Sequence, residues 1–134
     1  MKIEVNIKKL DEKKEKSEGK PDEIQMTENE AEHLIKYSAG VDEILCALAE
    51  EASELAQAAL KLRRVDTPSN PTVKNLHQCK ENIVEEVADI YTCLKLLGFF
   101  DTHYKNDIIE ISKEKLFRWA NRIKEARKNG STGR

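Results

Sequence analysis

Apolar residues recur every three or four positions along most of the chain after about residue 27. This spacing places side chains on one face of an α-helix, whereas a β-strand needs alternation by two. The longest regular run comprises Val41, Ile44, Leu45, Leu48, Ala52, Leu55, Ala59 and Leu62. No strand pattern of similar strength is present, so we expect an all-α protein.

Start and stop signals divide this pattern into four helices. Thr27 followed by Glu30 fits a capping box, which opens a helix that we expect to run to about Tyr37. Gly40 separates it from a second helix, which ends before the Pro-containing loop that begins at Thr67. The remaining two helices are expected from Leu76 to near Gly98, and from a cap at Asp101 or Thr102 to a stop at Asn129-Gly130. Four amphipathic helices in one chain predict a four-helix-bundle-like fold.

The two ends of the chain differ from this central part. Residues 1–22 are dominated by Lys and Glu, and such a segment buries too little apolar surface to offset its ordering entropy. We interpret it as a charged tail, although weak alternation at Ile3, Val5 and Ile7 leaves a short strand or docked arm open. Residues 23–129 form the predicted helical domain, and residues 130–134 form a second tail.

Composition excludes several classes of function. The chain has 134 residues, enough for one modest domain, and its formal net charge is −2, which argues against a non-specific nucleic-acid binder. No segment is apolar enough to cross a bilayer, and the charged N-terminus lacks the apolar part of a signal peptide. Because Cys46, Cys79 and Cys93 lie in apolar helical patterns without a CxxC pair, we expect small buried hydrophobic residues and no zinc site. These features predict a soluble, cytoplasmic protein.

Two acidic pairs stand out on the second and third helices. Glu51 and Glu54, like Glu86 and Asp89, are three positions apart and therefore lie on one side of a helix, one turn from each other. At about 100° per residue, Glu51 lies roughly 60° from the centre of its apolar stripe and Glu86 roughly 100°. We therefore expect Glu51 and Glu86 to be partly buried, with Glu54 and Asp89 beside them, whereas Glu50 points away from the core.

Like charges at this spacing need a counter-charge. A hard divalent cation supplies one, and a ligand set of oxygens without His or Cys favours magnesium, manganese or calcium over zinc. The pattern also occurs on ordinary solvated helix faces, so the residues alone leave a metal site and a plain charged surface both open. An EF-hand loop pattern is missing, which counts against a calcium-binding protein.

The order of these motifs resembles that of a known enzyme family. Glu51-x-x-Glu54 followed across a loop by Glu86-x-x-Asp89 is similar to the motifs of the MazG-like all-α nucleoside triphosphate pyrophosphohydrolases. The stretches EEASELAQAALKLRR and ENIVEEVADIYTCLKLL resemble both motif helices, and KLFRWANR, from Lys115 to Arg122, resembles the basic segment that follows them. The resemblance extends from about Glu30 to Lys128.

This resemblance implies hydrolysis of (deoxy)nucleoside triphosphates between the α- and β-phosphates, releasing pyrophosphate, in a homodimer or homotetramer of intertwined helices. It implies Mg²⁺, with Mn²⁺ as an alternative. The expected metal ligands are Glu51, Glu54, Glu86 and Asp89. The expected phosphate contacts are Lys115, Arg118 and Arg122. One of the four acids, or Glu50 or Glu85, is expected to orient the attacking water.

Two other functions remain open from the sequence. The same fold also serves pyrophosphohydrolases that act on a phosphoribosyl-nucleotide, and a non-catalytic helical interaction module would use the acids only as a solvated face. Neither alternative predicts nucleic acid or a membrane as a partner.

Overall fold

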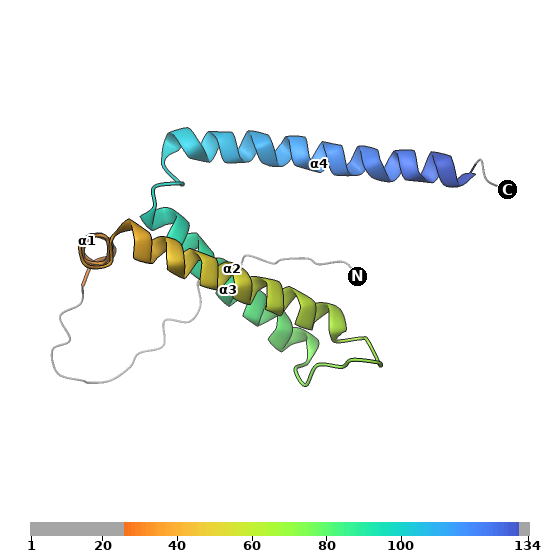
Figure 1. Ribbon diagram of the computed structural model, residues 1–134, viewed down its shortest axis with the longest axis horizontal. Helices are drawn as coiled ribbons and strands as arrows, with labels where there is room; N and C mark the ends of the chain where they lie inside the picture. The colour runs from red at the N-terminus through yellow and green to blue at the C-terminus, as the bar shows by residue number, and fades with distance from the viewer. Residues whose placement is uncertain (1–25, 132–134) are drawn as a thin grey trace, which may run out of the picture.

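The computed structural model describes residues 26–131, and that range folds into four helices without a strand (Figure 1). They are α1 (Glu28–Ser38), α2 (Gly40–Arg64), α3 (Leu76–Leu96) and α4 (Thr102–Ser131). The predicted all-α class and the order of the helices are therefore confirmed. No helix in the described range has the length and apolar character needed to span a membrane. The predicted N-terminal tail, with its open strand or arm, lies outside the described residues.

Local hydrogen bonds explain where the helices begin. The Thr27 hydroxyl accepts a hydrogen bond from the Glu30 amide at 3.3 Å, and the Glu30 carboxylate accepts one from the Thr27 amide at 2.7 Å, which is the predicted capping box. A second, unpredicted capping box joins Asn75 and Gln78 at the start of α3, with N···O distances of 2.9 and 3.0 Å.

Glycines end or separate helices at two of the three expected places. Gly40 and Gly98 have φ values of +74° and +82°, a left-handed conformation that favours glycine. Gly130 keeps a negative φ and lies inside α4, so the predicted stop at Asn129-Gly130 is wrong by a small margin.

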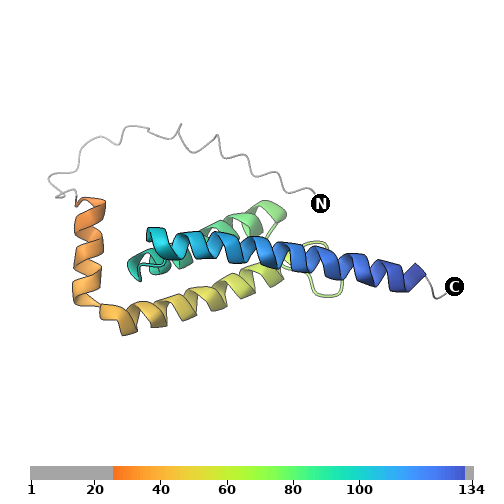
Figure 2. The same ribbon diagram turned by 90° about the horizontal axis from the view of Figure 1, so that it is seen from above.

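The core lies between α2 and α3, which run antiparallel and side by side along most of their length (Figures 1 and 2). Four residues in the described range are buried, namely Ile44 and Ala58 from α2 and Cys79 and Cys93 from α3. Cys79 and Cys93 thus match the expectation of small buried residues, but Cys46 is exposed and contradicts it, because it lies on the side of α2 that no described helix covers.

Helix α1 meets the start of α2 end to end and turns sharply away from it (Figure 2), and ion pairs also connect it to α3. The Lys95 ammonium on α3 donates a hydrogen bond to Glu28 and lies 2.8 Å from a Glu32 carboxylate oxygen. These bonds raise the pKa of Lys95, and the bond from Lys95 lowers the pKa of Glu32. Three charged side chains therefore connect the first helix to the third.

Helix α4 stands away from the α2–α3 pair (Figure 1), and its side chains are exposed along their described length. Large apolar side chains are among them, including Leu116, Phe117 and Trp119, the last 63% exposed. Within one chain the four helices therefore do not close into the bundle that the sequence predicted. The α2–α3 pair also leaves apolar side chains exposed, among them Leu60 and Val84, so apolar surfaces on both parts of the chain lack a cover within the described residues.

Lys95→Met should release α1 while leaving the α2–α3 pair intact. We expect the α1 amides to exchange with solvent several-fold faster than in the wild type, and the α2 and α3 amides to keep their protection, as measured by hydrogen–deuterium exchange. Acid should have the same effect. Because the folded pKa of Glu32 lies below the ordinary value of 4.5, its stabilisation is present above that value and is lost as the pH falls through the lowered pKa.

Lys36→Met is the matched control, because Lys36 pairs with Glu32 inside α1 at 3.8 Å and does not link two helices. Equal exchange in both variants would show that apolar contacts alone hold α1 in place.

Candidate metal centre

Three of the predicted metal ligands converge where α2 and α3 lie together. Glu51 and Glu54 from α2 and Glu86 from α3 each offer a carboxylate oxygen, and these oxygens all lie within 4.8 Å of one another. Glu51 and Glu86 are half-buried and Glu54 is exposed, as the positions of these acids around their helices predicted. The buried Ala58, one turn beyond Glu54, allows α3 to approach closely at this point.

The other predicted acids lie around this trio. Asp89 is exposed and outside the trio, but its charge has the largest Coulombic effect of any neighbour on Glu51, so the two side chains are close. Glu50 and Glu85 are exposed and act on Glu51 and Glu86 respectively. Asp89 is thus the nearest candidate for a fourth ligand or for the residue that orients water.

The electrostatics of the trio favour protons or a cation. Burial raises the pKa of Glu51, and the charges of Asp89 and Glu54 raise it further. Burial likewise raises the pKa of Glu86. The charge of Glu54 raises this pKa further, whereas the charge of Lys61 lowers it. Burial, Glu51 and Asp89 also raise the pKa of the Cys93 thiol, which therefore lies near the base of the acidic cluster.

A recess of about 230 Å³ opens directly beside these acids. Its polar walls are formed by Glu54, Gln57, Lys61, Asn82 and Glu86, with Ala58 beneath. Sequence reasoning missed Lys61. The sequence held part of the signal, because Lys61 follows Glu54 by seven positions and such residues share one side of a helix, but it did not show which residues of α3 face Lys61.

The predicted phosphate contacts are not at this recess. Lys115, Arg118 and Arg122 are exposed on α4, which stands apart from the acidic cluster in the single chain (Figure 1). At about 100° per residue, all three lie within about 60° of one another and form one basic edge beside the apolar stripe. The structure therefore groups the three cations but does not join them to the acids.

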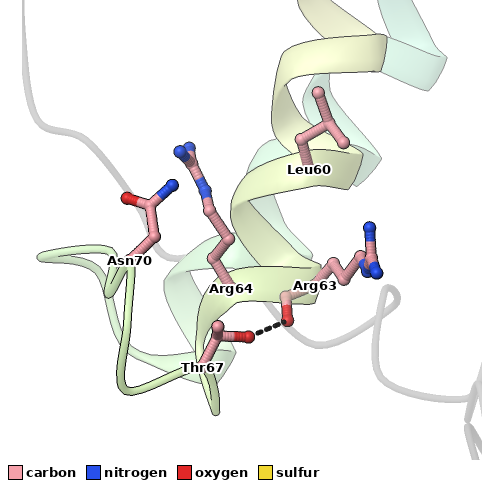
Figure 3. A pocket seen from close by; sticks show the side chains of 5 residues that line it. All are labelled: Leu60, Arg63, Arg64, Thr67 and Asn70. Carbon is pink, nitrogen blue, oxygen red and sulfur yellow. Dashed lines mark hydrogen bonds between the residues drawn. The ribbon is translucent and has the colours of Figure 1, made fainter.

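A second hollow, of about 390 Å³, lies where α2 meets the following loop (Figure 3). The side chains of Arg63 and Arg64 flank it on opposite sides, Leu60 lies at one end, and Thr67 donates a hydrogen bond to the Arg63 carbonyl at 3.3 Å. The Nε atom of Arg64 is buried and has no hydrogen-bond partner among the residues described. None of the predicted site residues lines this hollow.

Comparison of the chain with family models, with curated proteins and with solved structures finds no match. The resemblance to MazG-like enzymes therefore rests on the acidic and basic motifs and their order. What the structure adds is the convergence of three of the acids on one small volume.

Mg²⁺ should stabilise the wild-type protein, because a ligand that binds only the folded state raises the free energy of unfolding, by about 2.7 kcal/mol at a hundredfold excess over Kd. Thermal unfolding at increasing Mg²⁺ concentrations measures this effect. Glu51→Gln and Glu86→Gln should remove it, whereas Glu43→Gln, an exposed acid at the start of the same helix as Glu51, should retain it.

The stabilisation should weaken as the pH falls. The pKa values of Glu51 and Glu86 are raised, so protons compete with the metal at a higher pH than for ordinary carboxylates. Without metal, a fall in pH has the opposite effect on the free energy of unfolding contributed by Glu51 and Glu86. A raised pKa of an acid means that folding favours its protonated form, so these two groups stabilise the protein as they become neutral. Stabilisation by Mg²⁺ that persists in both Gln variants would place the cation elsewhere.

Proposed function

We propose that this chain is a Mg²⁺-dependent nucleoside triphosphate pyrophosphohydrolase that cleaves between the α- and β-phosphates. The observation that supports it best is the trio Glu51, Glu54 and Glu86, whose oxygens lie within 4.8 Å of one another on two adjacent helices. An all-oxygen set of this kind suits Mg²⁺, and also Mn²⁺. A polar recess with a lysine directly beside it provides space for phosphate groups.

Phosphate hydrolysis needs positioning and charge neutralisation more than covalent assistance from the protein. Mg²⁺, when bound, would supply positive charge against the phosphate oxygens. Glu51, Glu54 and Glu86 are the residues that would hold it. The half-buried positions of Glu51 and Glu86 restrict their side chains, which fixes the geometry of the site before the substrate arrives.

We assign the proton transfer to Asp89. A water oxygen attacks the α-phosphorus, the bond from that phosphorus to the bridging oxygen breaks, and the bond's electron pair leaves with pyrophosphate. The proton that the water loses passes to a carboxylate, and Asp89 lies beside Glu51 without belonging to the trio. Glu50 and Glu85 lie further out on the exposed rims of their helices.

We further propose that the protein works as a homo-oligomer, most simply a homodimer, with a homotetramer as the alternative. The single chain buries only four residues in the range described, while α4 exposes a row of large apolar side chains. A second copy would cover that row and bring the basic edge of α4, with Lys115 and Arg118, to an acidic cluster that lacks it. The three free cysteines suit a cytoplasmic location.

Incubation with a panel of nucleotides and Mg²⁺, assayed for pyrophosphate and orthophosphate, tests the reaction. The wild type should release pyrophosphate from (deoxy)nucleoside triphosphates. Glu51→Gln and Asp89→Asn should abolish turnover while the helical content measured by circular dichroism is retained. Glu43→Gln should remain active, because Glu43 is exposed in the first turn of α2, away from the trio.

Each other outcome would indicate a different function for this protein. Release of orthophosphate alone from a nucleoside triphosphate would contradict α–β cleavage. Turnover of a phosphoribosyl-nucleotide only would change the substrate class within the same fold. Loss of folding in both acidic variants would make the acids structural.

Trp119→Asp should lower the mass of the particle in sedimentation, because it puts a charge in the middle of the exposed apolar row of α4. A mixture of two inactive variants tests the shared site. Glu51→Gln lacks the acidic half and Arg118→Ala lacks part of the basic half, so mixed oligomers should recover part of the activity. Failure of mixing to restore any activity, with subunit exchange shown independently, would place both halves in one chain.

A further inference from the structure

We infer that Lys61 binds the terminal phosphates of the substrate and thereby selects triphosphates over diphosphates. This inference rests on the proposed function and adds the direction of the substrate. The leaving pyrophosphate would point along α2 toward the loop of residues 65–75, and the nucleoside would lie on the opposite side of the acidic trio, toward α1.

The surroundings of Lys61 support this role. It is half-buried and is the one cation in the lining of the recess of about 230 Å³, which it shares with Glu54 and Glu86. Gln57 and Asn82 add two amide groups that can donate hydrogen bonds to phosphate oxygens. The recess therefore begins with carboxylates suited to a cation and continues with donors suited to an anion.

Lys61 also lacks a partner within the protein. Of the lysines on the four helices, Lys36, Lys95, Lys113 and Lys128 each lie within 4.0 Å of a carboxylate oxygen. In residues 26–131 no such ion pair involves Lys61, nor Lys80, Lys105, Lys115 or Lys124, and of these five Lys61 alone lines the recess. Its charge is nevertheless felt at Glu86, whose pKa it lowers. The ammonium is thus near the acids but not bound by them, which leaves it available to a ligand.

The reach of the side chain matches a polyphosphate. Seven residues separate Lys61 from Glu54, which corresponds to about 10.5 Å along the helix axis. Side chains on a helix lean toward its N-terminus, and because Glu54 and Lys61 lean alike, only the greater length of the lysine side chain shortens this spacing. The phosphates beyond an α-phosphate at the metal would span the separation that remains.

A purely structural role for Lys61 makes a different prediction. A lysine that only offset the repulsion among Glu51, Glu54 and Glu86 would act on every substrate alike, because the acids are common to all of them. Contact with the terminal phosphates instead affects a nucleoside triphosphate more strongly than the matching diphosphate, whose chain is one phosphate shorter.

The test compares kcat/KM for a nucleoside triphosphate and its diphosphate in the wild type and in Lys61→Met. Loss of one charge-assisted contact should lower the triphosphate value about 10- to 100-fold and the diphosphate value much less. Lys61→Arg should recover most of the loss because it keeps the charge. Stabilisation by Mg²⁺ alone should be retained in Lys61→Met and not weakened, because the variant removes a positive charge near Glu86.

Two controls remove one positive charge elsewhere. Lys80→Met changes a half-buried lysine of α3 that does not line the recess, and Arg63→Met changes an exposed cation at the end of the same helix as Lys61. Both should retain the preference for triphosphate. An equal fall for the two substrates in Lys61→Met, or no fall, would overturn the inference even if the enzyme is active.

Binding of inorganic tripolyphosphate in the presence of Mg²⁺, measured by calorimetry, separates this inference from the proposed function. A wild type that hydrolyses no nucleotide refutes the enzyme, but Lys61→Met should still bind tripolyphosphate more weakly than the wild type and Lys80→Met. If no variant binds it, or if all bind it equally, Lys61 does not recognise phosphate.

Discussion

The contact between α2 and α3 determines where nearly everything else in the chain lies. Its buried members are Ile44, Ala58, Cys79 and Cys93, and three of these four are small. Small side chains allow two helix backbones to approach closely, and the approach brings the flank with Glu51 and Glu54 against the flank with Glu86. Larger residues at Ala58 or Cys79 would widen the pair and separate the oxygens. The acidic cluster is therefore a consequence of how this core is packed.

The same closeness has an electrostatic cost. Carboxylates that meet at the edge of an apolar contact repel each other and lose hydration, which is why burial is the largest cause of the raised pKa at both Glu51 and Glu86. Among residues 26–131, no ion pair offsets this repulsion at the trio. Elsewhere the chain does form such ion pairs, since Lys95 joins Glu28 and Glu32 across two helices. The cation that we propose at the trio would supply the missing counter-charge.

The sequence predicted local features better than distant ones. Helix boundaries followed from caps and glycines such as Thr27 and Gly40, because these signals act within a turn or two of the chain. The half-buried positions of Glu51 and Glu86 followed from helical periodicity. Lys61 was missed because its importance depends on which residues of α3 face it, and periodicity along one helix does not give that pairing. Gly130 was misjudged because a glycine permits a helix stop without requiring one.

The sequence also predicted a closed bundle that the single chain does not form, and here too the missing information concerns contacts between distant residues. Periodicity correctly gave α4 an apolar stripe, but it does not say whether the surface that covers this stripe belongs to the same chain. Two deficits of the single chain then coincide. Among the described residues nothing covers the stripe that contains Trp119, and no arginine lies in the acidic trio, whereas Arg118 and Arg122 lie on the edge of that stripe. One docking event between copies would remove both deficits, because covering the stripe necessarily brings its basic edge to another copy's surface. In the oligomer that we propose, the cations along that edge would be partly desolvated as the stripe is buried, which would favour carboxylates of another copy as their partners.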